Sequence, residues 1–406
     1  MADKYDLRRH MRFGTVVEGA RWDEDAQEWE VQVAGGEPVR ATYLVTATGF
    51  LSQPRLPDIE GVGSFAGQVV HSAKWDPTVP MAGKRVAVIG TGATAVQLIP
   101  ELADEAGHLT VFQRTPIWVT PKLDRRMPRW VQRTFAALPF TQRWARRVNT
   151  SILELVMVAA VLHYRHAQVL NRTAARIARR HLRRQVADPE LRRKLTPDYS
   201  FGCKRPTFSN DYYRTFSREN VSLETISIER ITPTGIELAD GRTVDVDVLV
   251  LATGFDMWDA NFPAIRIVGR DGKDLGQWWR STRFQAYQGI AVPGFPNLLS
   301  LASPYSYSGL SFFTTIEGQM KHMARLFGEV RRRGVRTFEV TDPANEEFLG
   351  WVTERLADSV FTLGSCATAR SYYFNQHGEP ALLRPTSTIN THREAERFPL
   401  DDYSYA

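Results

Sequence analysis

The chain has 406 residues, of which 43% are hydrophobic and 24% charged, and this length allows two or three domains with a sizeable core. This composition is ordinary for a soluble protein, and the formal net charge of +6 argues only weakly for an anionic partner. The two cysteines, Cys203 and Cys366, lie far apart without a CxxC pair, so the sequence predicts no disulfide framework and no dithiol redox centre, which excludes the disulfide reductases.

The start of the chain shows no sign of a targeting segment. Residues 1–4 are charged and no apolar stretch follows them, so we expect no signal peptide. The longest apolar run, residues 155–162, is too short to span a bilayer. We therefore expect a reduced, cytoplasmic setting.

The N-terminal part of the chain predicts a helix end followed by a β-hairpin. Residues 1–13 look like the end of an amphipathic helix, and residues 15–22 and 28–33 alternate as two strands around a polar loop. Residues 43–49 then predict a buried strand that ends in an Ala-Thr-Gly turn at Thr48 and Gly49. The same ending recurs about two hundred residues later at Thr253 and Gly254, which suggests two chain crossings between domains; simple structural punctuation is the alternative.

Residues 86–95 carry the opening of a dinucleotide-binding βαβ unit. A short β-branched run breaks into a GxGxxA turn, and helix-forming residues follow it. The first glycine allows the tight turn, the second lets a pyrophosphate approach the backbone, and the alanine keeps the helix near the strand, so the helix N-terminus can face the phosphates. The expected cofactor contacts here are Gly90, Thr91, Gly92, Ala93, Thr94 and Ala95.

The end of the next strand indicates which nicotinamide cofactor binds. An NAD site places an acidic residue there, about 20 residues beyond the glycines, whereas an NADP site places a cation. Here Arg114 and Thr115 follow residues 109–113, and no acidic residue stands on this strand. A guanidinium group matches the geometry of a phosphate. We therefore interpret the cofactor as NADPH, with a plain surface arginine as the alternative.

The middle of the chain, residues 121–197, is rich in Arg, Leu and Ala and helical by pattern. Residues 172–184 place arginines on one helical face and small apolar residues on the other. The main interpretation is a solvated helix packed on its own protein, and peripheral contact with an anionic membrane is the second. Nucleic acid is a weaker candidate because no RNA- or DNA-binding motif accompanies the charge.

The C-terminal part predicts a buried strand over residues 295–301 and a polar loop over 303–309. A helix is expected from about residue 310 to residue 330. As sequence alone, this loop is a polar cap on a helix.

A longer motif lies just before the glycine turn. Phe65, Gly67, His71 and Trp75, followed by Asp76, fill the pattern FxGxxxHxxxW. With the GxGxxA turn, this pattern resembles the fingerprint of the Baeyer–Villiger monooxygenases, flavin enzymes that use NADPH, FAD and O2. The likeness extends over residues 56–61, 111–116, 202–206, 211–213 and 252–255.

The resemblance implies an α/β fold with two dinucleotide-binding (Rossmann-like) domains, in which the NADP domain, with a helical insertion, is inserted in the FAD domain. It implies that Lys204 helps bind the 2′-phosphate of NADP and that Arg205, the catalytic residue, stabilises a C4a-peroxyflavin. That species inserts one oxygen atom into a ketone or an aldehyde. The resemblance also implies that the loop over residues 303–309 faces the isoalloxazine ring. We add His71 and the two Ala-Thr-Gly turns to the cofactor-binding set.

Complete members of that family begin with a further GxGxxG unit for FAD, followed by a segment with a catalytic aspartate. We expect this sequence to lack both. The domain division is then a partial FAD domain with a linker (1–77), an NADP domain in two parts (78–120 and 198–246), a helical insertion (121–197), and the rest of the FAD domain with the substrate side (247–406).

Two other functions are compatible with this sequence. A flavin monooxygenase that oxygenates sulfur or nitrogen, and a truncated NADP-binding protein without catalysis, both remain open. Hydrolases and metalloenzymes lack support because the sequence contains no GxSxG or HExxH and its nine histidines show no ligand spacing, so we expect no metal.

Overall fold

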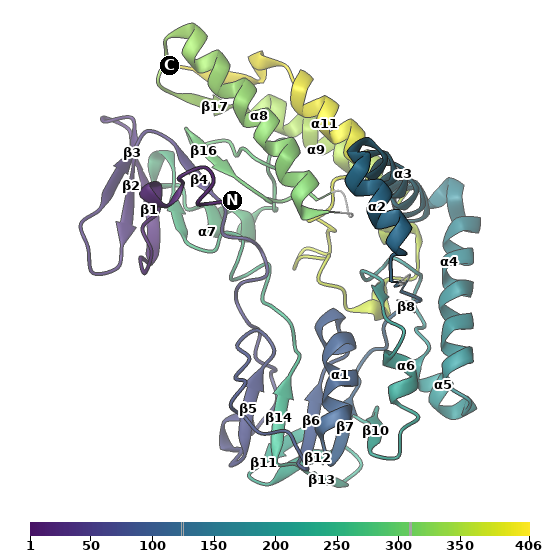
Figure 1. Cartoon of the computed structure of the whole chain (residues 1–406). Helices are drawn as coiled ribbons and strands as arrows, with labels where there is room; N and C mark the ends of the chain where they lie inside the picture. The colour runs from purple at the N-terminus through teal and green to yellow at the C-terminus, as the bar shows by residue number, and fades with distance from the viewer. Residues whose placement is uncertain (123, 125, 308–310) are drawn as a thin grey trace.

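The computed structural model describes residues 1–122, 124, 126–307 and 311–406, and it consists of two α/β lobes and a helical arm (Figure 1). In Figure 1 the lower lobe carries the glycine turn, the upper lobe contains both chain ends, and the arm stands beside them. The α/β class predicted from the sequence is confirmed.

The lower lobe is built on a five-stranded parallel sheet in the order β10-β7-β6-β14-β5. Its strands are β5 (Gln68–His71), β6 (Arg85–Ile89), β7 (His108–Phe112), β10 (Val221–Glu224) and β14 (Val248–Leu251). The apolar residues of β6 point alternately to the two faces of the sheet. Val86 and Val88 pack on the side of α1 (Ala93–Glu105), whereas Ala87 and Ile89 pack with the antiparallel meander β11 (Ile228–Thr232), β12 (Gly235–Leu238) and β13 (Thr243–Asp245). Burial of both faces explains the continuous apolar runs of these strands.

The upper lobe combines small sheets with helices, and one of these sheets is the antiparallel pair of β17 and β18. Another sheet has the order β15-β1-β2-β3, and a third pairs β4 with β16 in parallel. Its elements are β1 (Val17–Asp23), β2 (Glu28–Val33), β3 (Val39–Ala41), β4 (Leu44–Thr46), β15 (Arg266–Val268), α7 (Leu275–Ser281), β16 (Leu298–Ser300), α8 (Phe312–Arg333), β17 (Phe338–Val340), α9 (Asp342–Leu356), α10 (Val360–Leu363), α11 (Thr388–Arg397) and β18 (Tyr403–Tyr405). The predicted hairpin over residues 15–33 is confirmed by the antiparallel pairing of β1 with β2.

Two crossings join the lobes, as the paired Ala-Thr-Gly turns suggested. The outgoing segment lies beside the returning one, where Pro54 and Phe255 form an isolated antiparallel bridge. The Arg55 amide donates to the Gly254 carbonyl at 3.0 Å, which fixes the register of the crossing. Figure 1 shows the two crossings side by side between the lobes.

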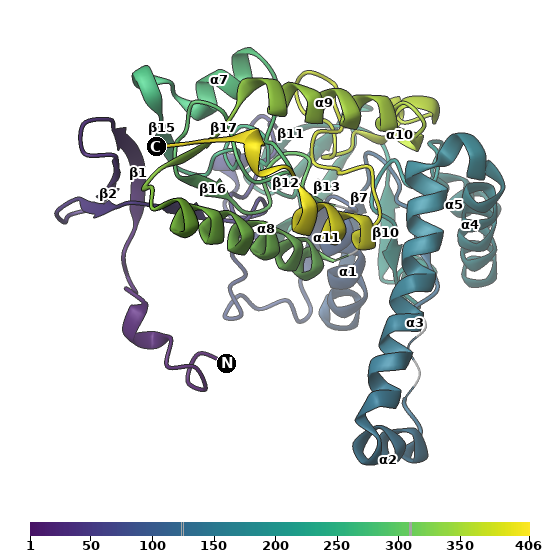
Figure 2. The same ribbon diagram turned by 90° about the horizontal axis from the view of Figure 1, so that it is seen from above.

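The helical insertion contains α2 (Arg129–Ala137), α3 (Pro139–Met157), the π-helical turn η3 (Val158–Leu162), α4 (Tyr164–Gln185) and α5 (Pro189–Leu195). Short strands β8 (Val119–Thr120) and β9 (Thr207–Phe208) connect it to the lower lobe, and α6 (Tyr212–Thr215) follows. On α4 the small residues Ala175, Ala178 and Leu182 are buried, while the arginines face solvent. The hairpin of α2 and α3 projects away from the body (Figure 2). None of the described helices is long and apolar enough to cross a membrane.

The structure bears on three further expectations from the sequence. The amphipathic helix over residues 1–13 is wrong, because this segment is exposed and contains only the 3-10 turn η1 (Arg8–His10), so no apolar face has a core to pack against. The helix expected from residue 310 is described from Phe312, and residues 308–310 lie outside the described chain. The domain division stays a prediction, but β5 and β14 pair within the lower sheet, on the far side of the boundaries at residues 77 and 247.

Candidate functional site

The glycine turn forms a cradle at the N-terminus of α1. Gly90 has φ of 112°, and an added Cβ would lie 2.5 Å from the Ala252 carbonyl oxygen, so only glycine fits. Gly92 differs, because a Cβ there would meet no described atom within 4 Å. Ala93 and Thr94 are exposed beside it, whereas Ala95 is fully buried against the sheet. The helix therefore begins with free backbone donors facing open space, which suits a pyrophosphate.

The predicted cation lies beside this cradle. The Thr91 hydroxyl donates to the Thr115 carbonyl oxygen at 2.9 Å and so ties the glycine turn to the end of β7. Arg114 directly precedes this contact. Burial lowers the pKa of Arg114, and the nearby charges of Arg370 and Arg55 lower it further.

Lys204 and Arg370 complete a cationic cluster with Arg114. Burial, together with the positive charges of Arg114 and Arg370, lowers the pKa of Lys204 to about 8, against a smaller opposing effect of Asp198. Lys204 is half-buried whereas Arg114 and Arg370 are exposed, and the three like charges repel one another unless an anion binds among them. The cluster therefore fits a phosphate group next to the glycine turn.

Arg370 was missed by the sequence analysis. It stands after the 3-10 turn η5 (Ala367–Ala369), on a segment 166 residues beyond Lys204, and has φ of 48°. No local motif marks this arginine. Its left-handed backbone conformation is unusual for a residue with a side chain, and it becomes apparent only in the folded chain.

Arg205 reaches toward the upper lobe. Its Nη1 donates to the Tyr307 hydroxyl at 2.6 Å, and the guanidinium carbon lies 5.7 Å from the centroid of the same ring. Tyr307 follows β16 in the loop that leads to α8. Two adjacent cations thus face different lobes: Lys204 belongs to the cluster of the lower lobe and Arg205 contacts the upper lobe.

The loop before α8 contains polar side chains without partners. The hydroxyl oxygens of Ser303, Ser306 and Thr315 are buried and form no hydrogen bond with any described residue. Buried polar groups are normally satisfied, so these three call for a polar group beyond those that the described residues supply. They occupy the loop and first helical turn expected beside the flavin, of which residues 308–310 lie outside the described chain. The arrangement fits a flavin there.

The first Ala-Thr-Gly turn lies in the upper lobe. Thr48 and Gly49, whose φ is 71°, line a small recess together with residues of the segment 261–267, Trp279 and residues 300–302. The next residue, Phe50, contacts the Tyr307 ring with centroids 6.5 Å apart. This turn therefore lies close to the partner of Arg205.

The second Ala-Thr-Gly turn is held by His71. The His71 Nδ1 accepts from the Ala73 amide at 3.1 Å, and its Nε2 lies 3.3 Å from the Thr253 hydroxyl, which donates to the Arg55 carbonyl. Burial lowers the pKa of His71, and the two contacts fit a ring that accepts at Nδ1 and donates from Nε2 to the Thr253 hydroxyl. His71 therefore fixes the crossing at Thr253 and Gly254 through hydrogen bonds within the protein.

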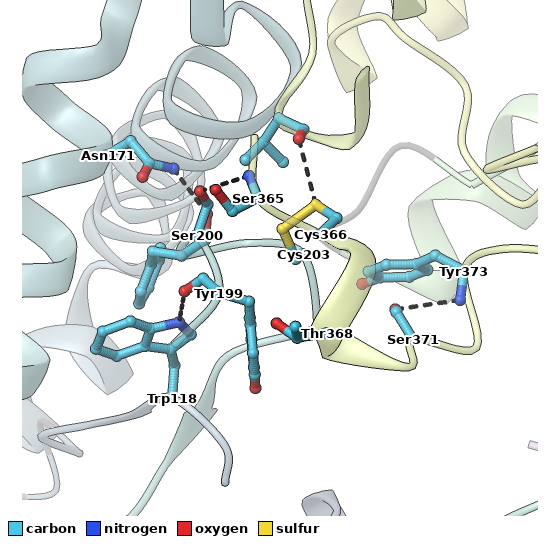
Figure 3. Close-up of a disulfide and its surroundings, with 12 residues drawn as sticks. Trp118, Asn171, Tyr199, Ser200, Cys203, Ser365, Cys366, Thr368, Ser371 and Tyr373 are labelled. Carbon is cyan, nitrogen blue, oxygen red and sulfur yellow. Dashed lines mark hydrogen bonds between the residues drawn. A yellow bond between two sulfur atoms is a disulfide. The ribbon is translucent and has the colours of Figure 1, made fainter. Parts of the chain in front are cut away.

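The cysteines correct another expectation. Cys203 and Cys366 form a disulfide across 163 positions of sequence, so the prediction of no disulfide is wrong (Figure 3). Rules based on sequence spacing detect local cysteine pairs, whereas this pair is brought together by the packing of the two lobes. The bond lies directly before Lys204 and four residues before Arg370.

The chain is similar in sequence and in structure to known flavoproteins. The family model described as pyridine nucleotide-disulphide oxidoreductase matches residues 6–152. A Baeyer–Villiger monooxygenase of Streptomyces coelicolor is 35% identical over 99% of this chain and 76% of its own length, and one of Pseudomonas aeruginosa is 36% identical over 99% and 75%. The crystal structure of OTEMO in complex with FAD and NADP has a TM-score of 0.86 at 29% identity, covering 100% of this chain and 83% of its own.

Proposed function

The chain belongs to the Baeyer–Villiger monooxygenases, and we propose that its residues use NADPH and FAD to insert one oxygen atom from O2 into a small-molecule ketone or aldehyde. It is an oxidoreductase of the flavin monooxygenase type, and the fold has the two Rossmann-like domains expected from the sequence. The chain spans about three quarters of the length of the curated relatives.

The nucleotide side of the proposal rests on the glycine cradle and the cationic cluster. Gly90 and Gly92 shape the turn, the free donors at the start of α1 would hold the pyrophosphate, and Thr91 keeps the neighbouring loop in register. Arg114, Lys204 and Arg370 would hold the 2′-phosphate. Because this phosphate is absent from NAD, these residues would select NADPH.

The flavin side rests on Arg205. A guanidinium group keeps its charge at neutral pH and releases no proton, so it can stabilise negative charge that develops beside it. The Tyr307 hydroxyl orients this group from the upper lobe. The chemistry supplied by bound FAD and NADPH is hydride transfer and the activation of O2. The contribution of the chain is position, charge and exclusion of water.

One observation carries this assignment. Lys204 and Arg205 are consecutive, yet Lys204 belongs to the cationic cluster and Arg205 contacts Tyr307. Replacement of each should therefore give a different defect. We expect Lys204→Met to weaken NADP⁺ binding while NADPH at saturation still supports oxygenation. We expect Arg205→Met to keep NADP⁺ affinity and to lose about 100-fold in ester formation from a ketone.

The test measures NADP⁺ binding by fluorescence and the ester product by gas chromatography, with the exposed Lys84→Met as a control. Equal loss of both properties in both variants would contradict the division of roles. Incubation with a ketone and a sulfide addresses the competing chemistry, since an enzyme dedicated to sulfur would oxygenate only the sulfide. A chain that binds NADPH and consumes no O2 after saturation with FAD would favour the non-catalytic alternative.

The sheet pairing suggests a revised domain division. We propose that the nicotinamide domain begins near residue 65 and ends near residue 252, so that it includes β5 and β14, with residues 121–197 as its helical insertion. The remaining segments would form the flavin domain. Proteolysis at the crossing near Arg55 and Gly254, combined with reduction of the Cys203–Cys366 disulfide, should separate the two parts.

We also propose that the protein makes peripheral membrane contact through α2 and α3. The apolar face of α4 packs in the cores, so it is not available. On α3, Phe140, Trp144, Val148 and Ile152 recur every fourth residue and are exposed, and Trp130 on α2 is 70% exposed. Arginines flank this stripe without any acidic residue between positions 124 and 154 and form no ion pair with described residues: Arg126, Arg129, Arg133, Arg143, Arg146 and Arg147. Exposed aromatics among unpaired arginines suit an anionic lipid surface.

A further inference from the structure

The disulfide lies between the two segments that supply the cationic cluster. Cys203 is completely buried and precedes Lys204, and Cys366 is the residue before η5, which Arg370 follows. Figure 3 shows the bond in the middle of the contact, with the segment of residues 199–203 on one side and that of residues 365–373 on the other. The disulfide therefore connects the segment that carries Lys204 covalently to the segment that carries Arg370.

Hydrogen bonds align the same two segments. The Ser200 amide donates to the Ser365 carbonyl at 3.2 Å, and the Ser365 amide donates to the Ser200 hydroxyl at 3.1 Å. The Thr368 hydroxyl donates to an Asp198 carboxylate oxygen at 3.1 Å. These bonds set the register of the segments, while the disulfide prevents their separation.

Two forces oppose this arrangement before a nucleotide binds. Lys204 and Arg370 carry like charges, and their repulsion contributes to the lowered pKa of Lys204. Arg370 also adopts a left-handed backbone conformation with φ of 48°, which is unfavourable for a residue with a side chain. Without the link, we expect the segment over residues 365–370 to relax away from Lys204.

We propose that the Cys203–Cys366 disulfide is a thiol-sensitive tether that holds Lys204 and Arg370 in position for the 2′-phosphate of NADPH. Reduction of the bond then weakens NADPH binding, and the cysteines act as positioning residues that touch neither substrate nor cofactor. The inference rests on the nucleotide site proposed above.

The reductant is a low-molecular-weight thiol. Its thiolate attacks Sγ of Cys366, the less buried sulfur, breaking the disulfide and forming a mixed disulfide, while Cys203 leaves as a thiolate and takes up a proton. A second thiol attacks the mixed disulfide, releasing the small-molecule disulfide and the Cys366 thiol. The protein gains two electrons and two protons, and a small-molecule disulfide reverses the exchange. Because both sulfurs are buried, attack requires local opening of the segment around Cys366.

Linkage adds a second expectation. If reduction weakens NADP⁺ binding by a given factor, bound NADP⁺ must stabilise the disulfide by the same factor. We therefore expect saturating NADP⁺ to protect the bond from dithiothreitol, whereas NAD⁺, which lacks the 2′-phosphate, protects it less.

The experiment compares dissociation constants of NADP⁺ and NAD⁺ for the protein oxidised with glutathione disulfide and reduced with dithiothreitol, with thiols counted by mass spectrometry. We expect reduction to weaken NADP⁺ binding at least fivefold and to leave NAD⁺ binding unchanged. The double variant Cys203→Ser, Cys366→Ser should resemble the reduced protein and ignore dithiothreitol. Arg370→Ser should show the same loss of NADP⁺ affinity in both redox states.

The outcomes separate the tether from the nucleotide site. Equal NADP⁺ affinity in the oxidised and reduced proteins, or two free thiols after oxidation, would overturn the tether. Equal weakening of NADP⁺ and NAD⁺ would also overturn it, since that pattern indicates general loosening. An oxidised protein that prefers NADP⁺ but does not respond to reduction contradicts the tether alone, whereas one without any preference contradicts the proposed nucleotide site.

Discussion

Lys204 should make the nucleotide-free protein less stable than a variant without its charge. Burial and the charges of Arg114 and Arg370 lower its pKa from 10.5 to about 8. At 1.36 kcal/mol for each pH unit, this difference corresponds to an unfavourable free energy of about 3 kcal/mol for the charged side chain in the folded state. Partial solvent screening reduces it, so we expect about 2 kcal/mol.

The replacement Lys204→Met tests this figure because it removes the charge and keeps most of the apolar side chain. At pH 7, urea unfolding should give a free energy of unfolding about 2 kcal/mol higher than that of the wild type. NADP⁺ binding should weaken roughly 10- to 100-fold, since a charge-assisted contact is lost, while NAD⁺ binding stays the same. Lys84→Met, at an exposed position, should change neither property.

The pH dependence gives the sign of the effect. Between pH 8 and 10.5 the unfolded chain binds the lysine proton more tightly than the folded chain, so the stability of the nucleotide-free wild type rises with pH relative to the variant. The two free energies of unfolding should converge above pH 10.5. A variant that is less stable than the wild type at pH 7, or a difference that is constant up to pH 10.5, would refute the reasoning.

Three further predictions concern Lys204, the glycine turn and the exposed aromatic residues of α2 and α3. NADP⁺ affinity, measured by fluorescence titration, should fall by about tenfold per pH unit above pH 8 as Lys204 loses its proton, while NAD⁺ affinity should not follow it. Gly90→Ala should lower the free energy of unfolding by at least about 1 kcal/mol because of its φ and the close carbonyl oxygen, whereas Gly92→Ala should fold normally and bind NADP⁺ more weakly; equal stability of the two would contradict the model of the turn. Co-sedimentation with vesicles containing phosphatidylserine should drop several-fold in the double variant Trp130→Ser, Trp144→Ser, and that of the wild type should disappear at high salt. Binding to neutral vesicles, or a salt-resistant dimer in place of vesicle binding, would exclude an anionic lipid surface.

The local parts of the fold could be predicted because their causes lie within a few neighbouring residues. The turn at Gly90 and Gly92 follows a buried strand, and both the φ of Gly90 and the open space at Gly92 agree with the roles assigned from the motif. The paired crossings followed from two identical turns. The predicted neighbours Arg114 and Lys204 are brought together although they are 90 positions apart.

The parts that sequence reasoning missed depend on contacts between distant segments. Arg370 and the Cys203–Cys366 bond arise where the C-terminal segment packs on the loop before Lys204, and neither has a motif of its own. The helix expected over residues 1–13 failed for the opposite reason, since an amphipathic pattern forms a stable helix only when another surface buries its apolar face. The assignment of β5 and β14 to a sheet required hydrogen-bond pairing that spacing does not reveal.

The most direct test of the account follows the oxygen atom. The purified protein, saturated with FAD, is incubated with NADPH, a cyclic ketone and ¹⁸O2, and the product is analysed by mass spectrometry. The account predicts a lactone with one ¹⁸O atom, formed by the wild type and lost in Arg205→Met while NADP⁺ binding is retained. An FAD-saturated protein that forms no labelled lactone, or a lactone yield that does not depend on Arg205, would contradict it.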